Sequence, residues 1–583
     1  MFDEIFRLFI KAAPVAVMLR GTLQNILSGK HLDALFEDTA VVQKIRYLAF
    51  SSVVFLMTQV VMRIRPSVHA AYQKKAKELR VSAKCVYKKL KGIEPAVSRE
   101  LVRRTGGEME RVIRAMSGTL PPLLPAYRVR ILDGNQLAGT HRRLKPLRGR
   151  KGAAMPGKSL AVLDPALKLV VDVFPCEDAY TQERALLPQV LEIVEAGDLY
   201  IDDRNFCTTS FLFGIAKRRA FFLVRQHAQS LHWELLGERV YKGEVETGRL
   251  FEQQVRLTDD EGNELFVRRI TIELHQPTRD GEMVLHLLTN VPEKDADART
   301  VACLYIHRWQ IETAFQELTV DLACEVNTLG YPKAALFAFC VAVVCYNAFS
   351  VVKAAIRTKH SDALGFVPET PCETTNPEPA CEGLDLEMQA SDRPMPGEDR
   401  PIPATIAQAA LNTLPTEHET SSPTIVDIKA PPAGSPALDI AQPAAVQRTD
   451  REMPPDAGNI AHASAALPEA KRLPKATSSQ RAAKARLSSD ELSTYYLAEE
   501  VAGMWQGMTV VLPERFWEEN FANLTPEELA TRLAEIAGQM CIDNYRKRPP
   551  SQKRIARNRP CQPGSHVSTA RVLKRTTKVK TAC

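Results

Sequence analysis

The stretch Val129-Arg-Ile-Leu-Asp133-Gly134 has the apolar character of a buried strand and closes on a carboxylate. A second stretch of the same kind, Leu199-Tyr-Ile-Asp202-Asp203, ends in two adjacent aspartates. Successive side chains of a strand point to opposite faces of the sheet, so only one of these two can share a site with Asp133. If the two strands are neighbours, the sequence predicts a pair of carboxylates at one place on the sheet.

A third acidic residue lies in the run Tyr305-Ile-His-Arg308-Trp-Gln-Ile-Glu312. Its phenol, guanidinium and carboxylate stand at offsets 0, +3 and +7, which on an α-helix fall within roughly 60° of one another. The run therefore predicts one helix with a face that offers a carboxylate for a divalent metal and an arginine for a phosphate. Together with two strand-end aspartates, Glu312 suggests a two-metal phosphodiester site.

These segments resemble the DDE transposases of bacterial insertion sequences, in the branch that carries a Y-x2-R-x3-E-x6-K signature. Besides the run 305–312, the segments that match are 132–135 and 201–206, which overlap the two strands above, and 566–571 near the C-terminus. The D-R-x-F pattern of these relatives, followed residue by residue, selects Asp203 rather than Asp202. The chain departs from the signature at its last position, where Thr319 stands in place of a lysine that contacts the DNA backbone in relatives.

The resemblance implies a metal-dependent enzyme of cut-and-paste DNA transposition. Asp133, Asp203 and Glu312 would hold two Mg²⁺ ions, with Mn²⁺ able to substitute. Tyr305 and Arg308 would position the scissile strand. The implied partners are the terminal inverted repeats and target DNA, bound by a homodimer in a synaptic complex in the bacterial cytoplasm at the nucleoid, with no membrane. Two alternatives stay open: a decayed element protein that still binds DNA, and a related nuclease without strand transfer.

The predicted fold class is α/β. From Tyr127 the sequence reads as a strand, a hairpin (159–163 and 168–174), a helix (about 182–196) and the strand that leads to Asp203. This is the order of an RNase H-like catalytic core, in which the first and fourth strands lie side by side. The adjacency would bring Asp133 and Asp203 together across seventy residues of chain.

The predicted domains number seven. They are a helical DNA-binding region at 1–120, the first part of the RNase H-like core at 121–218, a β-rich insertion at 219–293, the signature helix and its successor at 294–358, a disordered Pro-rich insertion at 359–489, C-terminal helices at 490–545 and a basic tail at 546–583. The prediction of disorder rests on composition: 18 of the 38 prolines fall in 359–489, and no aromatic residue occurs from 367 to 494. Such a segment cannot bury enough apolar surface to offset its chain entropy.

Basic residues are unevenly distributed along the 583-residue chain, whose net charge is +7. Residues 74–114 hold 13 Lys and Arg against 5 Asp and Glu, and residues 544–583 hold 12 against none. Two basic blocks are typical of a polyanion binder. Within the first block, 71–79 and 82–92 form a helix-turn-helix candidate whose second helix presents Lys84 and Lys88 to DNA. An ordinary basic surface helix is the alternative.

Other features carry less information. Arg204 is a candidate phosphate contact or a member of a structural ion pair. Trp233 and Tyr241, in the β-rich insertion, are candidates for stacking on a DNA base or for the core. Twelve cysteines without paired spacing indicate reduced thiols. The apolar stretches 47–62 and 334–352 predict buried helices rather than membrane spans.

Overall fold

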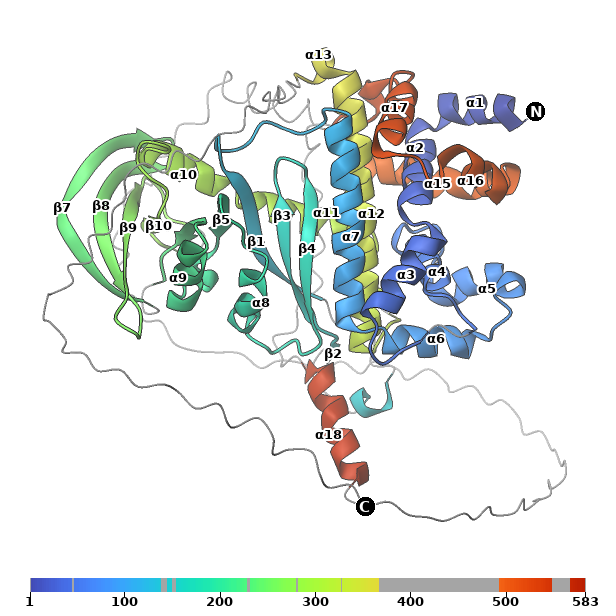
Figure 1. Ribbon diagram of the computed structural model, residues 1–583, viewed down its shortest axis with the longest axis horizontal. Coiled ribbons are helices and arrows are strands. Elements are labelled where there is room, and N and C mark those ends of the chain that lie inside the picture. Colours follow the sequence, from blue (N-terminus) through green and yellow to red (C-terminus); the bar gives the residue numbers. More distant parts are fainter. Residues whose placement is uncertain are drawn as a thin grey trace, which may run out of the picture. The chain divides into compact units, whose positions relative to one another are not determined.

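Five strands form one half of a nine-stranded sheet, in the order β4-β3-β1-β5-β6 with β4 at the edge (Figure 1). In the computed structural model their bounds are Leu169–Cys176 for β4, Lys158–Asp164 for β3, Arg128–Gln136 for β1, Asp198–Asp202 for β5 and Phe221–Arg225 for β6. β1 pairs with β3 in antiparallel and with β5 in parallel, and β5 pairs with β6 in parallel. The first and fourth predicted strands are therefore neighbours, and the mixed sheet is consistent with an RNase H-like core.

The structure describes residues 2–44, 47–137, 144–148, 154–227, 231–278, 281–326, 328–365, 492–547 and 567–581. The predicted disordered insertion lies outside these residues, apart from its first seven, which hold the end of α12 and the short helix α13 (Ser361–Leu364).

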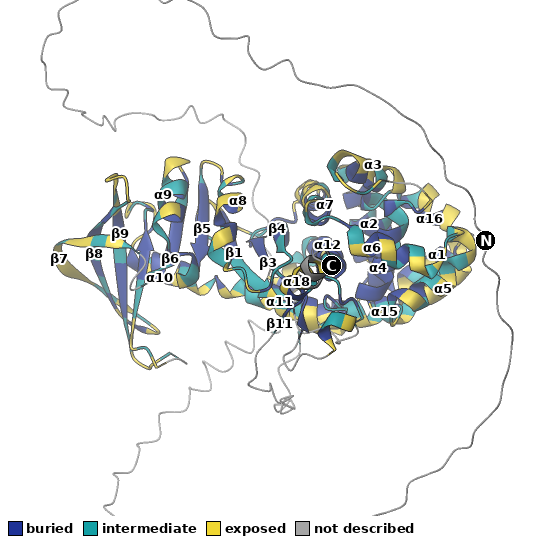
Figure 2. Ribbon diagram, turned by 90° about the horizontal axis from the view of Figure 1, so that it is seen from below, coloured by how far each residue is buried: buried dark blue, intermediate teal, exposed yellow. Residues whose placement is uncertain are grey.

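The sheet continues without a break beyond β6. The outer strands are β10 (Val284–Thr289), β9 (Glu264–Leu274), β8 (Gly248–Thr258) and β7 (His232–Val245), each antiparallel to its neighbour. The edge strand β7 is largely exposed, whereas β5 is buried (Figure 2). The β-rich segment predicted at 219–293 thus extends the central sheet, and β6 inside it pairs directly with the core.

The two faces of the sheet contribute to two hydrophobic cores. Ile131 and Ile201 belong to the larger core, whereas Leu132 and Tyr200 belong to the smaller one. The smaller core is covered by α8 (Leu187–Leu191) and α9 (Thr209–Lys217). The larger core includes buried residues of α7 (Pro95–Ala115), α10 (Ala298–Ile306), α11 (Trp309–Val320) and α12 (Pro332–Lys359).

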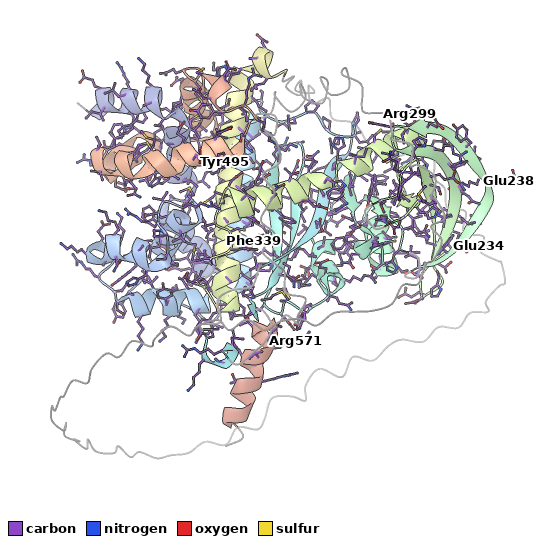
Figure 3. All side chains as sticks on the ribbon, turned by 180° about the vertical axis from the view of Figure 1, so that it is seen from behind. Glu234, Glu238, Arg299, Phe339, Tyr495 and Arg571 are labelled. Carbon is purple, nitrogen blue, oxygen red and sulfur yellow. The ribbon has the colours of Figure 1, made fainter. Side chains whose placement is uncertain are left out.

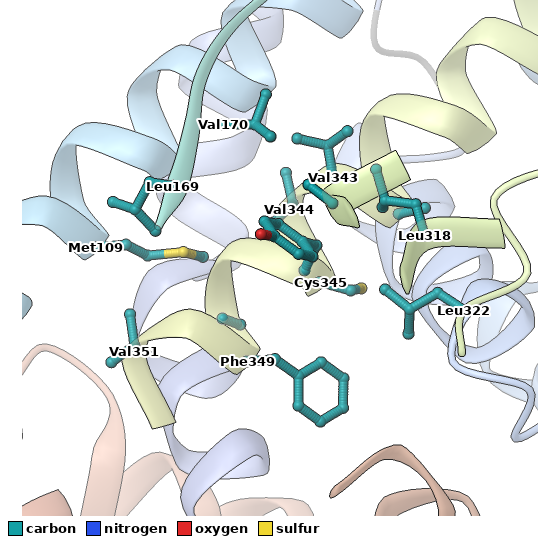
Figure 4. Close-up of a cluster of buried hydrophobic side chains, with 14 of the residues drawn as sticks. Met109, Leu169, Val170, Leu318, Leu322, Val343, Val344, Cys345, Phe349 and Val351 are labelled. Atoms are coloured by element: carbon teal, nitrogen blue, oxygen red, sulfur yellow. The ribbon is translucent and has the colours of Figure 1, made fainter. Parts of the chain in front are cut away.

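Helix α12 carries the second apolar stretch of the sequence. Its side chains pack among residues of α7, β4 and α11, as the cluster in Figure 4 shows. Asn347 interrupts the apolar stretch, and its amide pairs with the backbone of Val170 in β4, with both N···O distances at 2.9 Å. Among the described residues α12 alone has the length and composition of a membrane span, and its apolar stretch is entirely buried in the protein.

The N-terminal and C-terminal helices pack into one helical region. Its members are α1 (Phe2–Ala12), α2 (Pro14–Ile26), α3 (Gly29–Thr39), α4 (Phe50–Val61), α5 (Val68–Leu79), α6 (Ala83–Gly92), α15 (Thr494–Val511), α16 (Glu514–Phe521) and α17 (Pro526–Ala537). Arg20 of α2 donates to Glu514 of α16 at 2.6 Å, and Phe6 of α1 packs against Trp517. Segments about five hundred residues apart therefore share one core.

One predicted helix is shorter than expected. The helix predicted at 182–196 is a 3-10 turn (Glu183–Leu186) followed by the five-residue α8, because Pro188 supplies no backbone N–H and the chain turns toward β5 after Glu192. Among the C-terminal helices predicted at 490–545, α17 begins with a capping box between Thr525 and Glu528 and ends before Gly538.

Candidate active site

Asp133 and Asp203 lie on the same face of two adjacent strands. The parallel pairing of β1 with β5 ends at Leu132 and Asp202, so Asp133 and Asp203 occupy the next position of the register. Because side chains alternate, both follow Ile131 and Ile201 toward the larger core. The prediction that Asp133 closes its strand is wrong: β1 continues to Gln136, since its antiparallel pairing with β3 runs three residues further.

Asp202 points to the opposite face from this pair. It follows Tyr200 on β5 and is fully buried, and neither carboxylate oxygen makes a hydrogen bond of normal geometry to a described residue. Burial raises the pKa of Asp202 well above its usual range. The alternation along β5 therefore separates the two neighbouring aspartates, and it places Asp203, the residue preferred from the sequence, beside Asp133.

The prediction of one continuous helix from Tyr305 to Glu312 is wrong. α10 ends at Ile306 and α11 begins at Trp309, with a turn at His307 and Arg308. In this turn the backbone bonds are of the i to i−3 kind, for example from Arg308 N to Tyr305 O. From this turn the Arg308 guanidinium reaches Asp133 on β1.

Arg308 joins the carboxylates of the site. Its Nη1 lies 3.3 Å from Asp133 Oδ2, and its Nη2 lies 2.9 Å from Glu312 Oε1. The side chain is only 9% exposed, and its Nε has no hydrogen-bond partner among the described residues. The guanidinium also stands 4.9 Å from the centre of the Trp309 ring. Arg308 is thus a buried cation that links Asp133 of β1 to Glu312 of α11.

Electrostatic coupling connects the predicted residues. Burial raises the pKa of Asp133 to about 6; the Gly134 N–H and Arg308 oppose this rise, and the charges of Glu312 and Asp203 add to it. Burial is also the main cause of the raised pKa of the Tyr305 phenol. Burial by itself would lower the pKa of Arg308. Tyr305 and the three carboxylates have the larger combined effect, so the pKa of Arg308 is raised. The structure therefore brings all five predicted residues into one interacting group.

The donor set of this group fits a hard divalent cation, because such ions take carboxylate oxygens and the like charges around Asp133 repel one another. Among the described residues, however, no three His, Cys, Asp or Glu side chains are close enough to share an ion. Arg308 holds Asp133 and Glu312 in this arrangement. A shared ion would therefore require the Arg308 contact with Glu312 to open.

A basic cavity of about 550 Å³ is lined by Arg204, the residue that follows Asp203 in the chain. Arg204, next to Asp203, and Arg225 both pair with Glu282, so Arg204 is a member of an ion pair in this structure. Trp233 lines the cavity, and the Arg269 guanidinium lies 5.0 Å from its ring centre. Tyr241 is not among the lining residues and packs against Phe251. Of the two aromatic candidates, the structure brings only Trp233 to this cavity.

The sequence analysis missed Glu183 and Asn205. A Cβ at position 134 would collide with Glu183 Oε1, so glycine after Asp133 lets this carboxylate approach β1. Asn205 Nδ2 donates to Glu183 Oε2 at 2.6 Å, and both residues line a cavity of about 390 Å³. The Asp-Gly dipeptide was the available signal, but only the fold shows which side chain uses the space.

The predicted DNA-binding residues lie apart from this group. Ser82 caps α6 by accepting from Cys85 N, and Lys84 and Lys88 are exposed on α6. Thr319 is exposed on the last turn of α11, where its hydroxyl donates to Phe315 O at 2.8 Å. Beside it, Arg63 Nη2 donates to Val320 O at 2.6 Å. A cation is therefore present at the end of α11 where the signature lysine is missing.

One family model matches the part of the chain that holds this group. Residues 125–348 match the family model of the transposase DDE domain. The matched segment runs from β1 into α12 and contains Asp133, Asp203 and Glu312. A search of curated proteins finds no match. Residues 125–348 of this chain are therefore similar to a transposase DDE domain.

Proposed function

We propose that this protein binds the terminal inverted repeats of its mobile element and performs metal-dependent cleavage and strand transfer, in the manner of cut-and-paste transposition. The observation that carries the proposal is the convergence of Asp133 and Asp203 from adjacent parallel strands, with Glu312 tied to Asp133 through Arg308. A homodimer in the synaptic complex and the Y-x2-R-x3-E-x6-K branch belong to the same proposal.

Asp133, Asp203 and Glu312 would hold two Mg²⁺ ions, which supply an activated water or 3′-hydroxyl and stabilise the leaving oxygen. Arg308 neutralises the clustered carboxylates before DNA arrives and is placed to bind a phosphate once Glu312 is released. Tyr305 stays protonated because burial raises its pKa, so its phenol can donate a hydrogen bond to the scissile strand. Arg204, the residue after Asp203, and Arg225 share Glu282 as an ion-pair partner, which supports a phosphate-binding role for these two guanidinium groups.

The test uses a plasmid that carries the DNA flanking the gene, with and without Mg²⁺. Wild-type protein should nick at the element ends and then join them to target DNA. Asp203→Asn should abolish both reactions, while the matched neighbour Asp202→Asn should retain them, since Asp202 faces the other core and its raised pKa already favours the neutral form. Nicking by Asp203→Asn, with Asp202→Asn inactive, would overturn the site. Cleavage without joined products would instead favour a nuclease.

A further inference from the structure

A second basic cavity lies away from the carboxylates. Its volume is about 850 Å³, and five separate segments line it: the end of α6, the 3-10 turn η1 (Lys145–Leu147), the loop after β4, the start of α12, and α18 (Thr569–Thr581). None of Asp133, Asp203 and Glu312 is among the lining residues. The cavity is therefore not part of the site described above.

Four lysines line this cavity, which we call the lysine pocket: Lys91, Lys145, Lys333 and Lys574. Glu177 is the one acidic residue among the lining residues, and its Oε1 lies 3.9 Å from Lys333 Nζ. The other three lysines make no ion pair with a described carboxylate. Three of four positive charges thus have no acidic partner among the described residues, which makes the pocket suited to an anion.

The start of α12 adds to this positive potential. Tyr331, Pro332 and Lys333, which open this 28-residue helix, all line the pocket. The N-cap side chain makes no capping hydrogen bond. The positive end of the helix dipole therefore faces the same space as the lysines. Lys91 Nζ is held 4.3 Å from the centre of the Tyr331 ring, which fixes one lysine at the helix start.

Specific contacts hold α18 at the pocket. β11 (Val567–Ser568) pairs with β2 (Ala154–Met155), and Val572 packs against Leu147 and Ala154. Arg571, labelled in Figure 3, donates from Nε to Asp178 Oδ2 at 2.5 Å, and Ser568 Oγ donates to Asp178 Oδ1 at 2.6 Å.

The docked helix presents one face to the cavity. The residues that line it are Ala570, Leu573, Lys574 and Thr577, at offsets 0, +3, +4 and +7. The contacts that hold α18 against the rest of the protein therefore also position Lys574 at the pocket.

The positive surface extends beyond the pocket along α6. Lys84, Lys88 and Lys91 stand at offsets 0, +4 and +7, so they share one face of the helix, and all three are exposed. Lys91 therefore belongs both to this row of three lysines on α6 and to the lysine pocket. A single phosphate would contact only a few of these lysines. A polyanion is long enough to contact both the lysines on α6 and Lys574 on α18.

We propose that the lysine pocket binds the phosphodiester backbone of duplex DNA that also contacts α6. The inference rests on the proposed function for its choice of polyanion, and it assigns to the C-terminal helix a share of DNA binding at a site separate from catalysis. The basic tail then acts through a docked helix, and Asp178 is the positioning residue that holds Lys574 in place.

The test measures binding of a labelled random-sequence duplex by fluorescence anisotropy over a series of salt concentrations, without Mg²⁺. The variant Lys91→Gln/Lys145→Gln/Lys574→Gln should lower the slope of log affinity against log salt by about two to three units, at about 0.9 per phosphate contact. The control Lys11→Gln/Lys217→Gln/Lys294→Gln removes the same charge from exposed lysines outside the pocket and should change the slope little. Replacing the three pocket lysines by Arg should restore the slope.

Asp178→Asn provides a second test that net charge cannot explain. It removes a negative charge, yet it should reduce the slope by about one unit because α18 is released and Lys574 is lost from the pocket. Equal slopes for the two triple Gln variants would overturn the lysine pocket while leaving DNA binding by the protein intact. A wild-type protein that binds no duplex would overturn both the pocket and the proposed function.

Discussion

The carboxylate site and the lysine pocket have opposite characters. In the carboxylate site, negatively charged side chains lie close together beside the sheet, and the buried Arg308 pairs with two of them, Asp133 and Glu312. In the lysine pocket, exposed cations from distant segments surround an open cavity with a single acid. The difference shows that metal binding and phosphodiester cleavage need buried carboxylates that converge on one point. DNA affinity needs positive charges that are exposed and distributed over a surface. The two functions should therefore be separable by mutation.

The largest expected effect separates them directly. Asp203→Asn should lower the cleavage rate by about a thousandfold or more, equivalent to about 4 kcal/mol of activation free energy, while the salt dependence of DNA binding stays unchanged. The triple Gln variant of the lysine pocket should do the reverse, with weaker binding but a normal single-turnover rate at saturating DNA. A comparable loss of rate at saturation in both variants would contradict the separation.

A second prediction concerns Arg308. Arg308→Met replaces the guanidinium by an apolar side chain of similar length and leaves Asp133 and Glu312 without their cation. This change should lower the free energy of unfolding without metal by about 3 kcal/mol. Mg²⁺ should recover part of this loss, because a bound cation replaces the missing charge. Urea unfolding with and without Mg²⁺ measures both, and Arg308→Lys is the control that keeps the charge. A loss that Mg²⁺ leaves unchanged would show that Arg308 acts through packing alone.

The raised pKa of Asp133 predicts a pH effect on stability. Its folded pKa is about 6, whereas an unfolded aspartate titrates near about 3.9. Between these values the folded state binds more protons than the unfolded state, so metal-free stability should fall as pH rises from about 4 to 6, by about 2 kcal/mol after allowance for partial exposure. Asp133→Asn should remove this fall. A stability that rises over this interval because of Asp133 would contradict the assignment.

The smallest expected effect lies at the end of α11. Arg63→Gln should weaken duplex binding by about 1 kcal/mol and lower the salt slope by about one unit if Arg63 serves in place of the absent signature lysine. Thr319→Lys should restore both in that background and tighten binding less in wild type, because Arg63 already stands there. If Arg63→Gln has no effect and Thr319→Lys steepens the slope in wild type, the position is an unused DNA contact.

Local patterns in the sequence determined much of the architecture. Alternation and turn residues are short-range properties, and they placed the strands that carry Asp133 and Asp203, the hairpin around Asp164 and the helix predicted at 82–92, which is α6. The buried character of α12 followed from its apolar run. The order of the elements also indicated that the first and fourth strands pair, because this arrangement is shared by a known fold.

Tertiary structure alone decided which side chains meet. At the break between α10 and α11, Arg308 contacts Asp133, 175 residues away along the chain, and no local propensity encodes that contact. The union of N-terminal and C-terminal helices and the docking of α18 on Asp178 depend likewise on groups 390 or more residues apart. Helix periodicity and strand alternation tell which face a residue occupies. Packing decides what lies opposite that face, and both the carboxylate site and the lysine pocket are made of such encounters.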